Sequence, residues 1–218
     1  MKAIILFLPA LFISLNLFAT AQYPDKILYK EKEYALHSNP LEDYFSKHPD
    51  KRPQGGIIST ALWRGYVATF EVVDNQLFLK DIEIELSDTT NKQRFATKWK
   101  SVLNEVFPGQ SKIKITWLTG LLVIPHGKLM NYVHMGYGST YEKYILLEMN
   151  QGDLKKEKNF DHKEYEKFRQ RQFNAFRQTE EYKKLKEQMK KEKKYTDEFI
   201  DGFLRDFIVN YTSKILAD

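Results

Sequence analysis

The run from Gly65 to Leu86 constrains the fold more than any other part of the chain. Two stretches rich in β-branched and aromatic residues lie on either side of the dipeptide Asp74-Asn75. Both turn residues tolerate the positive φ that a two-residue hairpin turn requires. Beyond Lys80 apolar residues alternate with the acids Asp81, Glu83 and Glu85. The run therefore predicts a β-hairpin with one buried and one solvated face.

Similar patterns on both sides of this hairpin predict the fold class. Further strands are expected at 27–36 (a hairpin), 113–117, 121–124, 132–135 and 144–149. A short helix at 39–45 would have Asn39 as its N-cap. Apolar residues at 95, 99, 102, 103 and 106 follow a 3.6-residue period and predict an amphipathic helix. We expect an α+β body with an antiparallel sheet of hairpins packed with one amphipathic helix.

The C-terminal part reads as helix. Residues 161–194 contain no Gly or Pro, which predicts one long helix, and a second helix is expected to begin near Thr196. The second helix has an apolar face at four-residue steps, made by Phe199, Phe203, Phe207 and Tyr211. We expect this interaction face to be covered by the sheet or by a second copy of the chain, which would give a homodimer through the C-terminal helices. The body is thus followed by a long helical C-terminal region.

Charge divides the chain in the same place. Residues 22–154 hold 16 basic and 16 acidic side chains, whereas residues 155–194 hold 15 basic and 8 acidic ones. We therefore predict an α+β body at 22–154 and a basic helical C-terminal region at 155–218. Acids interspersed among the bases favour a solvated face and argue against nucleic acid as a partner. An anionic envelope component or a protein partner is the alternative.

The first 21 residues have the three parts of a signal peptide. Lys2 precedes an apolar run from Ala3 to Phe18, and Ala19-Thr20-Ala21 is a small-residue cleavage site. The alternative, an uncleaved anchor, is disfavoured because the run is short and is interrupted by Pro9. Cleavage near Ala21 would place the protein in the periplasm or outside the cell. No later apolar run reaches spanning length, so no transmembrane span is expected after Ala21.

Composition and motifs exclude several kinds of chemistry. The chain has no cysteine, which rules out a disulfide scaffold, a thiolate zinc site and a cysteine nucleophile. It contains no zinc-protease, nucleophile-elbow, phosphate-loop or dinucleotide motif. His126 and His134 are two histidines without a third ligand, so we predict no metal, no cofactor and no catalytic residues. The alternative is a small envelope hydrolase in which Asp81, Glu83 and Glu85 work with a histidine.

The segment from Trp63 to Tyr66 is the candidate binding site. Arg64 lies between Trp63 and Tyr66 at the entrance of the first hairpin strand. A guanidinium flanked by aromatic rings can present several donors to a carboxylate or a sugar. The alternative is structural, with Trp63 packing at the edge and Arg64 pairing with an acid such as Glu42 or Glu71.

Four segments of the body carry a resemblance. They are Asn39–Phe45, Trp63–Glu71, Leu77–Ile84 and Val133–Glu142, and they resemble segments of uncharacterised bacterial proteins. The resemblance covers most of residues 26–150 and implies a recurring module, but it transfers no activity or functional residue. We therefore expect an exported, soluble, non-catalytic binding or protein-interaction module of the bacterial envelope, with an unknown protein or envelope ligand as its partner.

Overall fold

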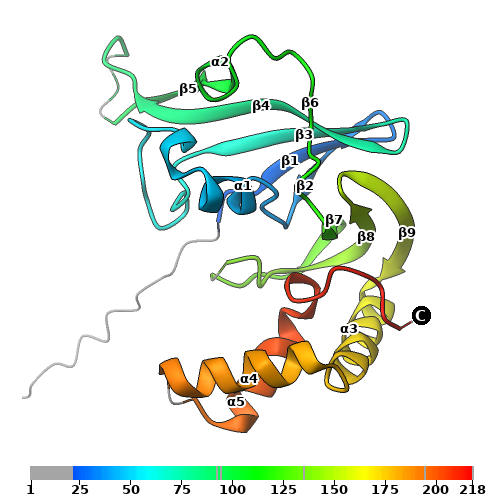
Figure 1. The fold of residues 1–218 in the computed structure, drawn as a ribbon. Coiled ribbons are helices and arrows are strands. Elements are labelled where there is room, and N and C mark those ends of the chain that lie inside the picture. Colours follow the sequence, from blue (N-terminus) through cyan, green and yellow to red (C-terminus); the bar gives the residue numbers. More distant parts are fainter. Residues whose placement is uncertain (1–21, 92, 94, 135, 194, 218) are drawn as a thin grey trace, which may run out of the picture.

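The computed structural model describes residues 22–217 apart from 92, 94, 135 and 194, so the expected signal peptide at 1–21 lies outside the described residues. Nine strands form one sheet in the described part of the chain (Figure 1). They are β1 (Asp25–Tyr29), β2 (Lys32–Leu36), β3 (Val67–Val73), β4 (Gln76–Ser87), β5 (Thr97–Ser101), β6 (Ile113–Lys114), β7 (Gly120–Asn131), β8 (Thr140–Asn150) and β9 (Asp153–Asp161). The helices are α1 (Glu42–Lys47), α2 (Leu103–Val106), α3 (His162–Phe176), α4 (Glu180–Lys193) and α5 (Asp197–Asp206), with 3-10 turns η1 (Pro49–Lys51) and η2 (Ile208–Asn210).

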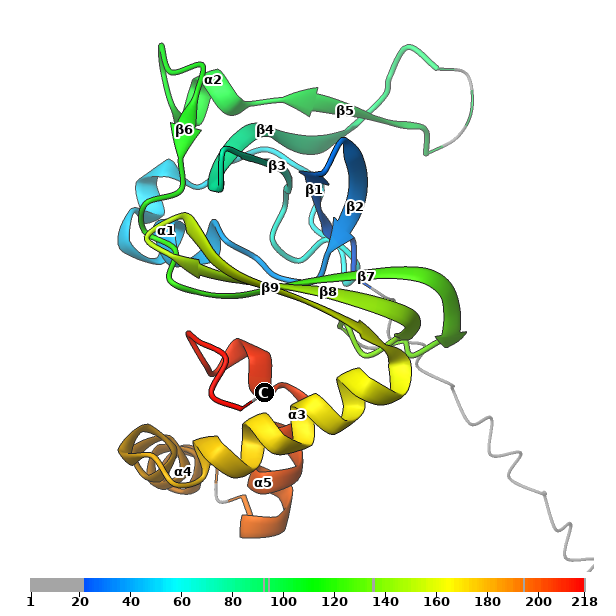
Figure 2. The same cartoon turned by 90° about the vertical axis from the view of Figure 1, so that its right-hand side faces the viewer.

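The sheet curls back on itself. Its strand order is β2-β1-β3-β4-β9-β8-β7, with β5 and β6 also paired to β4. Just beyond β2, the backbone N–H of His37 donates to the carbonyl of Val123 on β7 at 2.8 Å, so the last strand lies against the first. In Figure 2 the strands β1–β4 lie above β7–β9, and the helices α3–α5 lie below β7–β9. The molecule therefore has three layers with two interiors between them.

Each interior has its own hydrophobic core, and β7 and β8 contribute to both. Leu122 and Ile124 belong to the core enclosed by the curled sheet, whereas their neighbours Leu121 and Val123 belong to the core beneath the sheet, between β7–β8 and the C-terminal helices. Successive side chains of a strand point to opposite faces, so a strand with two buried faces is apolar throughout. This explains the unbroken apolar run at residues 121–124.

The predicted fold class is wrong in two respects, of which the sheet is the first. The sheet is mixed because β1 and β3 pair in parallel, with Ile27 opposite Phe70. Parallel neighbours need a long crossover, and the segment that carries α1 and η1 between β2 and β3 supplies it. The hairpin itself is confirmed: Asp74 and Asn75 have φ values of 51° and 58° and join β3 to β4.

The second error is the long helical C-terminal region. Residues up to Asp161 still belong to β9, which crosses the boundary expected at residue 154, and the remainder forms three separate helices. The break between α3 and α4 lies at Thr179. Its hydroxyl accepts the N–H of Tyr182 at 3.2 Å and donates to the carbonyl of Phe176 at 2.8 Å, which caps the start of α4.

The amphipathic helix predicted at residues 95–106 is mostly a strand. Residues 97–101 form β5, which pairs antiparallel with the outer half of β4, and only Leu103–Val106 is helical. Phe95 has a φ of 65° and is 84% exposed, and Trp99 is 40% exposed. The outer half of β4 needs a hydrogen-bonding partner, and this tertiary pairing overrides the helical spacing of the apolar residues.

Candidate functional site

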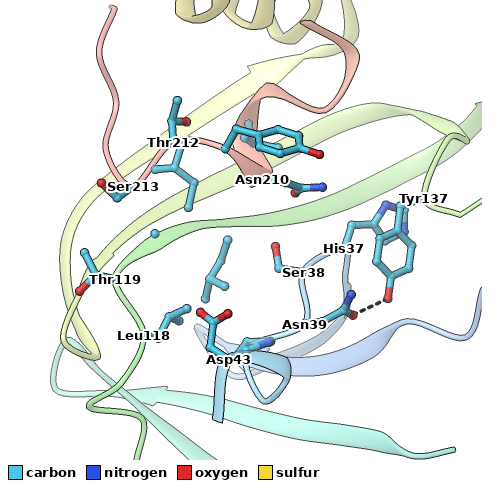
Figure 3. A pocket seen from close by; sticks show the side chains of 16 residues that line it. His37, Ser38, Asn39, Asp43, Leu118, Thr119, Tyr137, Asn210, Thr212 and Ser213 are labelled. Carbon is cyan, nitrogen blue, oxygen red and sulfur yellow. Dashed lines mark hydrogen bonds between the residues drawn. The ribbon is translucent and has the colours of Figure 1, made fainter. Parts of the chain in front are cut away.

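A polar cleft lies between the closing edge of the sheet and the C-terminal segment. Its first cavity, of about 520 Å³, is bordered on one side by the residues that follow β2 and on the other by those that follow η2. Figure 3 shows Ser38, Asn39 and Asp43 on one side of this cavity and Asn210 and Thr212 on the other. A second cavity of about 820 Å³ shares several of these lining residues and extends toward α3.

His37 lines both cavities. Its ring stacks on Tyr137 with 4.6 Å between the ring centroids, and the edge of Tyr141 lies 5.5 Å away. Burial lowers the pKa of His37 to about 4, so the ring is neutral near pH 7. Among the described residues its ring nitrogens have no hydrogen-bond partner, which leaves one donor and one acceptor available.

A hydrogen-bond network fixes the floor of the cleft. Arg64 donates from Nη1 to Asn39 at 2.5 Å and to the hydroxyl of Tyr137 at 2.8 Å. This hydroxyl donates to Asn39 at 2.8 Å, the bond that is dashed in Figure 3. Burial raises the pKa of Tyr137 to about 12, so its hydroxyl keeps its proton. The Tyr137 ring that stacks on His37 is therefore held in place by a hydrogen bond from the permanently charged Arg64.

That cation is paired with a buried acid. Arg64 donates from Nη2 to Asp25 at 2.9 Å, and the same oxygen of Asp25 accepts the N–H of Ala68 at 2.9 Å. The other carboxylate oxygen of Asp25 and the Nε of Arg64 are buried without a partner among the described residues. Burial raises the pKa of Asp25 to about 6, although Arg64 opposes the shift.

The predicted binding segment Trp63–Tyr66 is therefore divided by the structure. Arg64 is only 4% exposed and its donors bind inside the protein, to Asp25 rather than to Glu42 or Glu71. Tyr66 is completely buried, and its hydroxyl donates to Glu42 at 2.7 Å. Glu42 also accepts two hydrogen bonds from Arg52. Trp63 alone of the three is exposed.

A buried glutamine fixes the other wall of the cleft. Gln172 on α3 donates to Thr212 at 3.3 Å and to the carbonyl of Lys214 at 2.7 Å. Its Oε1 accepts the backbone N–H groups of Leu216 at 2.9 Å and Ala217 at 3.2 Å. One side chain thus holds the C-terminal segment that borders the cavity.

The predicted interaction face lies on α5 and η2, away from the centre of the packing. Phe199 is 51% exposed, and Phe203, Phe207 and Tyr211 are partly exposed and contact one another ring to ring. The core beneath the sheet is instead filled by the adjacent positions Ile200, Leu204 and Ile208. Ile200 and Leu204 lie on α5, which packs on α3, and Ile208 lies on η2, which packs on β7, so this neighbouring stripe is the enclosed one. Phe203 and Tyr211 pack against the same core but remain partly exposed.

The acids and histidines considered for catalysis do not meet. Asp81 accepts from Ser101 at 2.6 Å and Glu85 accepts from Thr97 at 2.6 Å, whereas His126 packs on Tyr34. His134 packs on Tyr132. Across the residues that the structure describes, no three His, Asp or Glu side chains form a group that could hold a metal ion.

Sequence reasoning missed the residues that build the cleft. Asn39 is not the N-cap that the sequence predicts, because α1 begins three residues later. The side chain of Asn39 instead accepts hydrogen bonds from Arg64 and Tyr137. Nothing local distinguishes His37 or Gln172, because their environment is created by segments far away in the chain. The only local signal for the cleft is a group of polar residues, Asn210, Thr212 and Ser213, near the end of the apolar face of the last helix.

In the described residues no helix is both long and apolar enough to cross a bilayer. No family model matches the chain, and neither a curated protein nor a solved structure matches it.

Proposed function

We propose that the protein is a non-catalytic binding module that holds a small, neutral ligand with hydroxyl or amide groups in the polar cleft. The observation that carries this proposal is His37, a partly buried and neutral imidazole with unused hydrogen-bonding capacity, stacked on a tyrosine that the buried Arg64 holds in place. Such preorganised polar groups in a concave site favour specific recognition of a small molecule.

The lining of the smaller cavity indicates the charge of the ligand. Among the described residues its polar side chains are hydroxyls, amides and the imidazole, with Asp43 as the one carboxylate. The described lining contains no Lys or Arg, so a phosphate or sulfate group would meet no compensating cation there. Side chains that both donate and accept, such as Asn210 and Ser213, suit hydroxyl and amide groups.

We further propose that the module acts in the bacterial envelope after export. This part depends on the leader pattern ending at Ala21, which predicts Gln22 as the first mature residue. Mass spectrometry of protein recovered from the periplasm would test it. A mass that includes Met1 would contradict cleavage.

Ligand binding can be tested by histidine-detected NMR with a panel of N-acetylated dipeptide amides and cyclic polyols. We expect at least one compound to shift the imidazole resonances of His37. Asn210→Leu places an apolar side chain in the cleft and is expected to abolish the shift. Gln188→Leu is the matched control because Gln188 is exposed on α4, is not among the residues that line either cavity, and donates to Glu192.

Two outcomes would contradict the proposal. In one, no member of the panel shifts the resonances of His37. In the other, a compound shifts them equally in Asn210→Leu and in the unaltered protein, which would place its binding site elsewhere.

A further inference from the structure

A second concave site lies on the outer face of the strands β1–β5, separate from the cleft. This groove has a volume of about 400 Å³. Val67 and Ala35 contribute apolar surface to it, and the rings of Tyr23 and Trp99 border it. None of its lining residues belongs to either cavity of the cleft.

The rings of Tyr23 and Trp99 are partly exposed, and packing of the core does not account for their position. Trp99 is 40% exposed and Tyr23 is 46% exposed, and their ring centroids are 6.0 Å apart with the planes 69° apart. Trp99 lies on β5, a strand whose residues are all exposed, and it is paired with Glu85 of β4. Exposed tryptophan and tyrosine beside a groove are typical of ligand contacts, since one side of the ring is apolar and accessible.

Tyr23 is fixed before any ligand arrives. Its backbone N–H donates to the carbonyl of Ala61 at 2.9 Å, and its own carbonyl accepts from Nη2 of Arg64 at 3.1 Å. Arg64 is in turn anchored by Asp25. The backbone of Tyr23 is therefore attached to the same buried ion pair that supports Tyr137 in the cleft, so little backbone ordering is needed there on binding.

The polar groups of the groove carry both signs of charge. Lys26 and Glu83 form a loose pair with 3.7 Å between nitrogen and oxygen, so both retain hydrogen-bonding capacity. Glu33 has no partner among the described residues. Lys26 is thus one cation beside the two carboxylates Glu33 and Glu83 in the described lining, a combination that disfavours an anionic ligand and offers both donors and acceptors to a neutral one.

From this combination we infer that the groove binds a neutral saccharide, with one sugar ring stacked on Trp99. The apolar C–H face of a pyranose would lie on the indole, while its hydroxyls would bind Glu33, Lys26 and Glu83, which together supply both donors and acceptors. This site is additional to the cleft and would give the module a second, carbohydrate-directed contact.

The purified protein can be titrated with maltose, cellobiose and diacetylchitobiose by calorimetry, and the indole N–H resonances followed by NMR. We expect saturable binding of at least one disaccharide with a shift of the Trp99 resonance. Trp99→Ala should weaken that binding about tenfold, which corresponds to about 1.4 kcal/mol. Trp99→Phe, which keeps a ring, should retain most of the affinity.

Trp63→Ala is the matched control. Trp63 is the same residue type, is 46% exposed and lies outside the groove, so its replacement should leave the affinity unchanged. The inference is overturned if none of the disaccharides binds, or if Trp99→Ala binds as tightly as the unaltered protein while its circular dichroism is unchanged. Binding of choline without binding of any disaccharide would also overturn it, by assigning the groove to a cation.

Discussion

Nη2 of Arg64 and Oδ1 of Asp25 are 2.9 Å apart, and the two side chains are 2% and 0% exposed. This pair also binds the backbone of Tyr23 and the side chains of Asn39 and Tyr137. A buried charge that loses its partner is costly, because neither water nor another cation replaces the lost interaction. Loss of either partner should therefore destabilise the fold.

Arg64→Met should lower the free energy of unfolding by about 3 to 5 kcal/mol near pH 7, since it leaves the Asp25 carboxylate buried and unpaired. Arg52→Met is the matched control. Arg52 also binds an acid, Glu42, but both side chains are partly exposed, so the loss should be about 1 kcal/mol. Urea denaturation followed by circular dichroism measures both. Equal losses in the two variants would show that burial of the Arg64 pair has no special weight.

Asp25 and His37 should make opposite contributions to the pH dependence of stability. Asp25 has a pKa raised to about 6, so between about pH 4 and pH 6 the folded state binds more protons there than the unfolded state. This contribution to stability is lost as the pH rises. His37 has a pKa lowered to about 4, so over about pH 4 to 6.5 the unfolded state binds more protons, and its contribution is lost as the pH falls.

Because these contributions cancel in part, variants are needed to separate them. Asp25→Asn should make the free energy of unfolding rise more steeply between pH 4 and 6, by up to about 3 kcal/mol relative to the unaltered protein. His37→Gln should make the same profile fall or flatten. Urea midpoints at a series of pH values measure the slopes. A profile for Asp25→Asn that runs parallel to that of the unaltered protein would show that Asp25 does not titrate in this window.

The core beneath the sheet should make the C-terminal helices indispensable to the body. Phe168 is completely buried between α3 and the sheet, so Phe168→Ala should cost about 3 to 5 kcal/mol. Phe199→Ala is the control on α5, and it should cost less than about 1 kcal/mol because half of that ring is exposed. Thermal denaturation distinguishes the two.

Removal of residues 162–218 should expose Leu121 and Val123 and cause aggregation, which light scattering detects.

Gln172→Met should loosen the wall of the cleft that follows η2. The change removes the acceptor of two backbone N–H groups and the donor to the carbonyl of Lys214, at about 1 to 3 kcal/mol for each buried group left unpaired. Hydrogen exchange at Leu216 and trimming by a carboxypeptidase should both accelerate. Gln170→Met, a change on the exposed side of the same helix, should leave both rates unaltered. Unchanged exchange in Gln172→Met would contradict this role.

The sequence predicts the local hairpins well and their assembly poorly. The turn at Asp74-Asn75 is encoded by residues that accept positive φ, and the structure has it where expected. The parallel pairing of β1 with β3 joins residues such as Ile27 and Phe70 that are far apart in the chain, for which no local pattern exists. Trp99 shows the same limit, since its helical spacing to Val102 and Val106 is overridden by pairing with Glu85.

The candidate site shows a different limit. The aromatic neighbours of Arg64 predict a ligand contact. In the structure Arg64 is buried and donates hydrogen bonds to Tyr137 and Asp25 instead. Its partner Asp25 lies 39 residues away at the start of β1, and no spacing rule connects the two. His37 and Gln172 acquire their properties only from burial, which depends on the complete fold.

The double-sided burial of β7 and β8 has an evolutionary consequence. On an ordinary half-solvated strand every second position accepts polar replacements freely, so sequences drift there. Residues 121–124 and 144–147 have no such positions, because each side chain is enclosed by one core or the other. These eight residues should be the least mutable stretch of the protein, and a saturation mutagenesis screen for folded product would recover them as two short, uninterrupted blocks of intolerance.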